Sequence, residues 1–295
     1  MNRLHLIDSS VGDNAFEDAE LLFQKQKQRE EEHRGRLISE MQDIYDITSN
    51  FATDLDGTKG LAVFGPAGIG KTQSVTQALI DSKASVEYLK GADISPAGLY
   101  CTLWFNRDPH RILVLDDVDL IGGGEKSKQI MALLKAATEN TYKPREIAWI
   151  KAAPNVTMKE HNIPNKFEYW GNIVWITNDN PREIMKKKSL APHFRAILSR
   201  FTPAILDWNK ADCYMWTKHL IEWEDMLGKN CQSKKGGYNK DVIADVLKFF
   251  RENFKALNDI TPRLATKIAH NRFRFHEEDR WVSMSRNTSN MWTDQ

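Results

Sequence analysis

A short apolar run, a glycine-rich loop and a helical pattern follow one another between Gly60 and Thr72, and this stretch constrains the fold most strongly. Leu61 to Phe64 predicts a buried strand of a parallel sheet. The run breaks at the glycines, and a helical pattern resumes from Lys71. A parallel strand joined to a helix by a tight turn is the unit of doubly wound sheets, so the sequence predicts an α/β, doubly wound core.

The loop itself fits G-x-x-x-x-G-K-[ST] at every fixed position, through Gly65, Gly70, Lys71 and Thr72. Glycines let successive backbone N–H groups turn inward around phosphate oxygens, and the helix that follows adds its positive N-terminal end. Lys71 would reach the β- and γ-phosphates and the Thr72 hydroxyl would hold Mg²⁺. ATP and Mg²⁺ are therefore the expected cofactors; an accidental glycine-rich turn is the alternative. The predicted nucleotide-binding residues are Gly65, Pro66, Ala67, Gly68, Ile69, Gly70, Lys71, Thr72 and Gln73.

Composition excludes several other classes of protein. In 295 residues, 41 Lys and Arg nearly balance 40 Asp and Glu, so any nucleic-acid contact must come from a local patch. The three cysteines lack C-x-x-C spacing, which argues against a zinc site or a disulfide framework and suits a reducing compartment. Without an apolar run of about 18 residues or a signal-like N-terminus, the chain is predicted to be soluble and cytoplasmic.

A second strand signal ends in carboxylates. Arg111 to Leu115 is largely apolar and is followed by Asp116 and Asp117, at the end of a strand where open α/β sheets bind ligands. Asp116 would join Thr72 at the metal, and Asp117 would polarise an attacking water, as in a Walker B element. A strand end with two aspartates is unremarkable alone, but it gains weight about 45 residues after a complete phosphate loop.

From this point the chain resembles the AAA+ ATPase family. Asn178 follows the apolar run Asn172 to Thr177 and matches the family's sensor 1, although Asn178 also suits a plain turn. Arg200 matches the family's arginine finger, with Arg195 as the second candidate; either would stabilise the γ-phosphate of a neighbouring subunit. The alternative for each arginine is a surface residue that caps a helix C-terminus.

Arg263 matches the family's sensor 2, just inside a helix that Thr261 would cap and Pro262 would begin. An arginine there is unfavourable beside the positive helix N-terminus, which favours a function over a plain first-turn residue. The resemblance implies a ring, and the expected size is a hexamer. Asp117 departs from the family, which usually has Glu at this position, so the side chain is one methylene shorter.

The expected domains are a helical N-terminal extension over 1–50, a nucleotide-binding domain over 51–204, a small helical lid over 205–275 and a polar, poorly ordered tail over 276–295. The extension is expected to hold a helix over 14–34 and a second amphipathic stretch over 35–50. In the lid, helices are expected over 210–227, 240–256 and 262–271.

Between the second and third core strands, Arg145–Ile150 and Lys166–Trp170 alternate like two short strands with turn residues between them. This resembles the hairpin inserted before sensor 1 in an AAA+ branch that includes superfamily 3 viral helicases. Its expected DNA contacts, which would grip phosphates without sequence preference, are Lys151, Lys159, His161 and Lys166. Lysines also occur on any solvated loop, so this alternative stays open.

These features predict an ATPase directed at DNA, a helicase or helicase loader of a replication or recombination system, with a phage or mobile element as its expected source and the host cytoplasm as its location. Replication proteins and single-stranded DNA are the expected partners besides the chain itself. Two alternatives stay open: a protein-remodelling ATPase, and an ATP-dependent switch or scaffold with slow hydrolysis.

Overall fold

Five parallel strands form the central sheet. The computed structural model describes residues 10–54, 57–91, 93–121, 124–149 and 156–289. The strands lie in the order β2-β3-β6-β1-β7 and all neighbouring pairs are parallel. Their bounds are β1 Gly60–Phe64, β2 Ser85–Lys90, β3 Arg111–Asp116, β6 Asn172–Thr177 and β7 Phe201–Ile205. The predicted doubly wound P-loop NTPase core is therefore confirmed.

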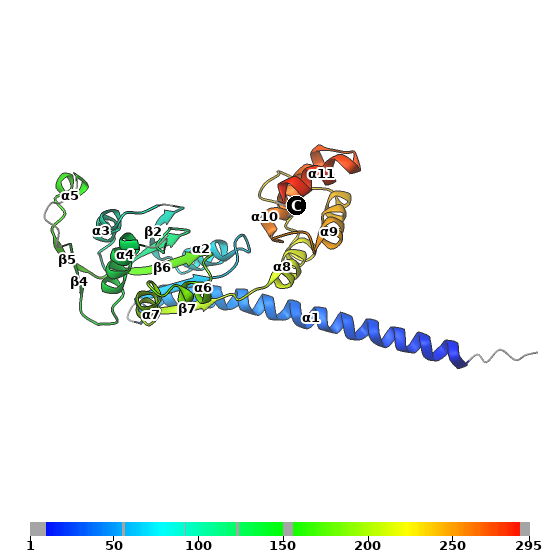
Figure 1. Ribbon diagram of the computed structural model, residues 1–295, viewed down its shortest axis with the longest axis horizontal. Coiled ribbons are helices and arrows are strands. Elements are labelled where there is room, and N and C mark those ends of the chain that lie inside the picture. The colour runs from blue at the N-terminus through cyan, green and yellow to red at the C-terminus, as the bar shows by residue number, and fades with distance from the viewer. Residues whose placement is uncertain (1–9, 55–56, 92, 122–123, 150–155, 290–295) are drawn as a thin grey trace, which may run out of the picture.

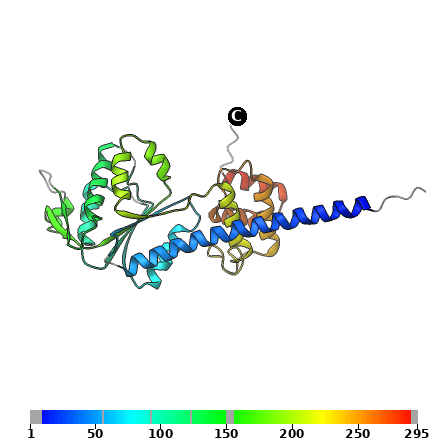
Figure 2. The same ribbon diagram turned by 90° about the horizontal axis from the view of Figure 1, so that it is seen from below.

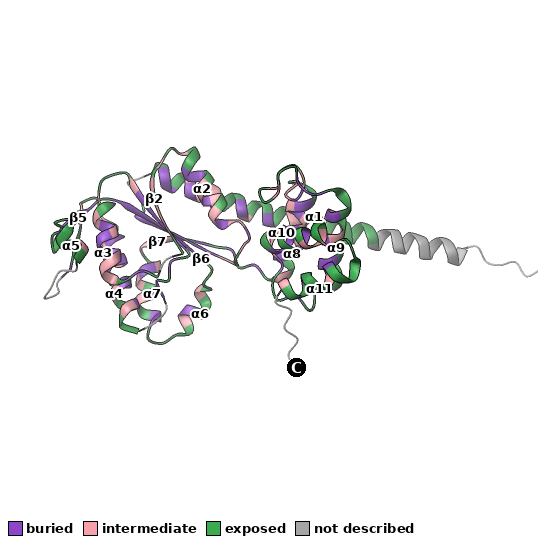
Figure 3. Cartoon of the chain, turned by 90° about the horizontal axis from the view of Figure 1, so that it is seen from above, coloured by how far each residue is buried: buried purple, intermediate pink, exposed green. Residues whose placement is uncertain are grey.

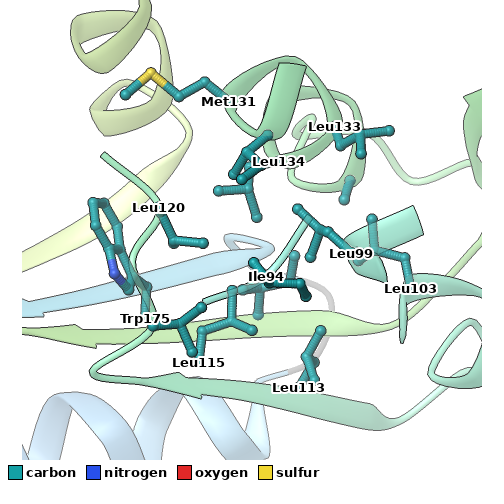
Figure 4. Packing of buried hydrophobic residues seen from close by; sticks show 14 of the residues in the cluster. Ile94, Leu99, Leu103, Leu113, Leu115, Leu120, Met131, Leu133, Leu134 and Trp175 are labelled. Atoms are coloured by element: carbon teal, nitrogen blue, oxygen red, sulfur yellow. The ribbon is translucent and has the colours of Figure 1, made fainter. Parts of the chain in front are cut away.

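Helices cover both faces of this sheet because side chains of a strand alternate between its faces. Leu61 and Val63 of β1 pack with α1 and α2, whereas Ala62 and Phe64 pack with α3, α4 and α7. Figure 4 shows part of the second cluster, in which Trp175 of β6 lies beside Leu115 of β3 and Leu120, which follows that strand. The core helices are α2 Lys71–Asp81, α3 Pro96–Phe105, α4 Gly124–Ala137, α6 Pro181–Lys186 and α7 Ala191–Leu198.

A single helix, α1 (Ser10–Thr53, 44 residues), replaces the two predicted N-terminal stretches. It runs beneath the core and past the lid (Figures 1 and 2). The predicted break is absent because contacts with the rest of the protein lie on both sides of it: His33 and Arg36 both pair with Asp212 across Gly35. Leu37 and Met41 then follow on the buried face, which offsets the roughly 1 kcal/mol that a glycine costs inside a helix.

The lid is a separate helical layer with its own hydrophobic core, centred on Val246, Phe250 and Ile268. Its helices are α8 Lys210–Glu222, α9 Lys240–Asn253, α10 Pro262–Arg274 and α11 Glu278–Thr288. The expectation of a poorly ordered tail from residue 276 is wrong over α11. Trp281 is buried and its ring packs on Phe249, so this aromatic side chain helps to anchor a largely polar helix to the lid. Figure 3 shows the same division into buried inner and exposed outer helix faces.

The predicted hairpin is confirmed. β4 (Arg145–Ala148) pairs antiparallel with β5 (Lys166–Tyr169), and a short helix, α5 (Val156–Glu160), lies in the connection. Buried Arg145 fixes the base of the hairpin: its guanidinium donates to the carbonyls of Ala137, Tyr169 and Gly171 at 2.8, 3.2 and 2.7 Å. Burial lowers the pKa of Arg145 to about 10. None of the described helices is long and apolar enough to cross a membrane.

Candidate nucleotide site

The predicted nucleotide residues meet at the carboxyl edge of the sheet. β6 lies between β1 and β3, and the register pairs Phe64 with Thr177 and Asp116 with Ile176. The phosphate loop (residues 65–72), Asp116 and Asn178 therefore leave neighbouring strands at the same level. This convergence follows from the strand order, because parallel strands deliver their C-terminal residues to one edge.

Lys71 is buried at the mouth of the phosphate loop, with 5% of its surface exposed. Its ammonium group donates to the carbonyls of Gly65 and Pro66 at 2.8 and 2.7 Å and to Asn178 Oδ1 at 2.7 Å. Burial lowers the pKa of Lys71 to about 8, although Asp117 and Asp116 attract its proton. The three acceptors replace part of the hydration that a buried ammonium loses.

The oxygen groups expected at the metal lie together. Thr72 Oγ1 donates to Asp116 Oδ1 at 2.9 Å. A hydroxyl and a carboxylate suit Mg²⁺, which takes one or two protein oxygens and completes its shell with water and phosphate. A site of this kind needs no cluster of protein ligands, and the part of the chain that the structure describes holds no group of three or more His, Cys, Asp or Glu side chains suited to a metal.

Asn178 links the loop lysine to the second acid. Its carbonyl accepts from Lys71, and its amide nitrogen donates to Asp117 Oδ1 at 2.8 Å. Asp117 has a φ of 51°, in the left-handed region, and its backbone N–H donates to the Ile176 carbonyl at 3.0 Å. This unusual backbone carries the Asp117 side chain away from the strand and toward Asn178.

The lid closes over the phosphate loop. A side chain placed on Gly68, whose φ is 73°, would lie 3.4 Å from Thr261 and 3.6 Å from Cβ of Arg263. Thr261 caps α10 as predicted, with its hydroxyl accepting from the Leu264 N–H. A cleft of about 270 Å³ lies between the loop and the lid, and residues of both line it, including Pro66, Asn209, Cys213, Asp259 and Arg263.

The two arginine-finger candidates lie at the end of α7, before edge strand β7. Arg200 is half-buried and donates to the Ala196 carbonyl at 2.7 Å, whereas Arg195 is exposed in the last turn of α7. Within one chain, Arg200 thus binds a carbonyl at the C-terminal end of α7, as expected of an arginine that merely caps a helix. Arg195 has the more accessible side chain.

The hairpin adjoins the amino-terminal end of β6, because β5 ends just before β6 begins (Figure 1). The phosphate loop lies at the carboxyl ends of the strands, so the two are on opposite sides of the core. Lys159 is exposed on α5, and His161 follows that helix with its ring 5.2 Å from the ring of Phe105. Lys166 lies on β5, where it pairs with Glu146 of the facing strand. Lys151 lies outside the described residues.

Sequence reasoning missed a polar network that joins α1, the lid and the loop. Trp216 of α8 donates its indole N–H to the Ile69 carbonyl at 2.8 Å. Asp212, four residues earlier, accepts from His33 and Arg36 of α1. These partners are about 150 or more residues apart in sequence, and neither motif spacing nor periodicity connects them.

The chain is 32% identical over 217 residues to an uncharacterised 36.7 kDa protein of Enterobacteria phage T4, from the nrdC-mobD intergenic region. The match covers 72% of this chain and 62% of the relative, so it spans less than two thirds of the relative's length. No protein-family model matches the chain.

Two solved structures from Thermotoga maritima are distantly similar. For the RuvB Holliday junction branch migration motor, the TM-score is 0.44 at 11% identity, over 84% of this chain and 68% of that one. For domain III of the replication initiation protein DnaA, it is 0.42 at 12% identity, over 83% and 91%. The fold class given above rests on the chain's own strand order and phosphate loop.

Proposed function

We propose that the protein is a Mg²⁺-dependent ATPase of the AAA+ family that acts on DNA. One observation supports the ATPase part of the proposal. A hydrogen-bonded pair, Thr72–Asp116, and a hydrogen-bonded chain, Lys71–Asn178–Asp117, meet beside a complete phosphate loop. The first would offer oxygen ligands to a metal, and the second would offer a carboxylate and an amide to the attacking water. Together they provide the parts that phosphoryl transfer needs.

In this proposal residues 65–73 bind ATP and the Lys71 ammonium exchanges the loop carbonyls for the β- and γ-phosphates. Thr72 and Asp116 would hold Mg²⁺, which neutralises phosphate charge when bound. Asp117 accepts a hydrogen bond from the attacking water, and Asn178 orients Asp117 and that water. Asp117 is shorter than Glu by one methylene, and its left-handed backbone and its bond to Asn178 would orient its carboxylate toward that water.

The remaining charge stabilisation would come from arginines. Arg263, which lies beside the phosphate loop at the start of α10, would sense the γ-phosphate from the lid. Arg200 or Arg195 would complete the site of a neighbouring subunit in a ring, for which we propose a hexamer. The exposed position of Arg195 favours it over Arg200, whose guanidinium already binds a carbonyl of its own helix.

The proposal of a DNA substrate rests on the hairpin. Its β4–β5 ladder is pinned by Arg145, so α5 and its neighbours are carried on a rigid base at the edge away from ATP. Lys159 and His161 are the described groups available for phosphates; Lys166, paired with Glu146, and Lys151 complete the proposed set. The likeness to a phage T4 protein supports a phage or mobile-element source, with a helicase or helicase loader in the host cytoplasm as the finer proposal.

Hydrolysis of ATP by the purified chain, with and without single- or double-stranded DNA, tests this proposal. We expect DNA to stimulate wild-type hydrolysis and a Lys159→Glu, His161→Glu variant to lose that stimulation but keep the basal rate. Lys128→Glu, Lys135→Gln on exposed or half-exposed positions of α4 is the charge-matched control, because each pair removes three units of positive charge when histidine is counted as neutral. Hydrolysis indifferent to DNA would refute the DNA substrate and favour protein remodelling, the second candidate, or a slow switch.

A further inference from the structure

The lid touches the phosphate loop through one buried hydrogen bond. The indole N–H of Trp216 donates to the Ile69 carbonyl at 2.8 Å, and Ile69 and Trp216 are 0% and 8% exposed. The Trp216 ring also packs edge-on against Trp208, with 5.6 Å between ring centroids. Trp216 therefore packs in the same hydrophobic cluster as Ile69, and its indole nitrogen donates to the phosphate loop.

The hydrogen bond to the Ile69 carbonyl also fixes the direction of the Gly70 N–H. The C=O and N–H of a trans peptide point to opposite sides, so the Ile69 carbonyl determines where the Gly70 N–H points. Gly70 caps α2 with a φ of 107°, a conformation that suits glycine. Glycine also permits the flipped peptide, because it adopts positive and negative φ with similar ease. The loop sequence alone therefore leaves this peptide free to rotate.

We propose that Trp216 is a positioning residue for ATP binding, which locks the Ile69–Gly70 peptide so that the Gly70 N–H stays available to phosphate. The inference rests on the proposed nucleotide function of the loop. Trp216 touches the loop from the side of the lid, so it acts through Gly70 rather than on the nucleotide. A lid helix thereby becomes part of the phosphate site.

Helix α1 holds Trp216 in place. Asp212, one turn before Trp216 on α8, is buried and accepts from His33 at 2.7 Å and from Arg36. Arg36 also donates to Glu40 at 2.8 Å, and Glu40 accepts the indole N–H of Trp208. Because α1 packs on α2 at its other end, it ties the first lid helix to the core from below (Figure 2).

A purely structural role is the alternative, since a buried tryptophan generally needs a partner for its N–H. The two roles differ in what Trp216→Phe changes. Phenylalanine keeps an aromatic ring in the core but lacks the donor. A structural role predicts a lower melting temperature alone. A positioning role predicts, in addition, weaker nucleotide binding and a less protected loop.

The test compares wild type, Trp216→Phe and the matched control Trp223→Phe, whose tryptophan is 63% exposed just after α8. We expect Trp216→Phe to bind MgADP about 3- to 10-fold more weakly by calorimetry, the range of one net hydrogen bond. The KM for ATP should rise by a similar factor while kcat stays within twofold, since the contact is equal in ground and transition states. The control should match wild type.

Amide exchange of the loop peptide separates this inference from the proposed function. In Trp216→Phe without nucleotide, the peptide that contains Gly70 and Lys71 should exchange faster, whereas the loop in Trp223→Phe should not. Unchanged loop exchange would overturn the inference, even if wild type bound no MgADP and the nucleotide function failed. If wild type binds MgADP and Trp216→Phe binds it with the same affinity, the inference is also overturned.

A second variant covers the case in which Trp216→Phe does not fold. Arg36→Gln leaves the tryptophan in place but removes the charged partner that Asp212 and Glu40 share. We expect the same direction of change in loop exchange and MgADP affinity, and less than additive effects in the double variant if both act through one contact. If loop exchange in Arg36→Gln equals that of wild type, α1 does not hold Trp216 in place.

Discussion

Binding of nucleotide should draw a proton onto Lys71. Its pKa is lowered to about 8 by burial, and the β-phosphate of MgADP placed beside the ammonium would raise it well above that value. With a free-state pKa near 8, Lys71 is about 10% neutral at pH 7, about half neutral at pH 8 and about 90% neutral at pH 9. Binding of MgADP should therefore take up roughly 0.1, 0.5 and 0.9 proton per site at these three pH values.

The sign of the pH dependence follows from the same linkage. A proton is gained on binding, so affinity for MgADP should be nearly constant below about pH 7 and fall more and more steeply above it, approaching about tenfold per pH unit well above pH 8. Calorimetry in two buffers with different ionisation enthalpies measures the uptake directly, as the slope of the observed binding enthalpy against buffer enthalpy.

Lys71→Arg isolates the group responsible, because a guanidinium stays charged throughout this range. The variant should bind without proton uptake, and Lys83→Arg, at an exposed lysine after α2, should behave like wild type. A wild-type enthalpy that does not depend on the buffer at pH 8 would refute the account of Lys71 as a buried, partly neutral base.

Three further predictions concern separate parts of the molecule. Asn178→Ala should lower kcat about 10²-fold or more with little change in MgADP affinity, because the amide orients Asp117 rather than the diphosphate; steady-state kinetics would contradict this if only KM rose. Arg145→Met leaves three buried carbonyls without their donor and should lower the free energy of unfolding by about 3 kcal/mol or more, measured by denaturant titration, whereas a loss under 1 kcal/mol would show that the hairpin is not pinned there. Trp281→Ala should cost about 3–5 kcal/mol of lid stability and release α11 to fast amide exchange, while the same measurement on Met284→Ala, which is 39% exposed, should barely change.

The parts of the site that follow strands were predictable from sequence. Asp116 and Asn178 come directly after apolar runs, and parallel strands bring their C-terminal ends to one edge, so the motif spacing already places both beside Lys71. The hairpin strands were predictable from alternation for a similar reason, since period two is a local property. The left-handed backbone of Asp117 has no comparable signal.

What sequence could not supply depends on contacts between distant elements. The contact of Trp216 with Ile69 depends on the placement of the lid over the loop, and the unbroken α1 depends on Asp212 of that same lid. Helix α11 is polar except on a narrow face, so composition alone predicts disorder. The helix is ordered because Trp281 is buried in the core of the lid, a contact that composition does not reveal. Local pattern does not encode such tertiary anchors.

The most direct test of the central claim, an ATPase site at the phosphate loop, is phosphate release from MgATP by wild type and by Lys71→Ala without DNA. We expect measurable turnover by wild type and none above background for the variant, which lacks the ammonium that Gly65, Pro66 and Asn178 hold in place. Equal turnover by the two proteins would contradict it, because hydrolysis would then not depend on the loop.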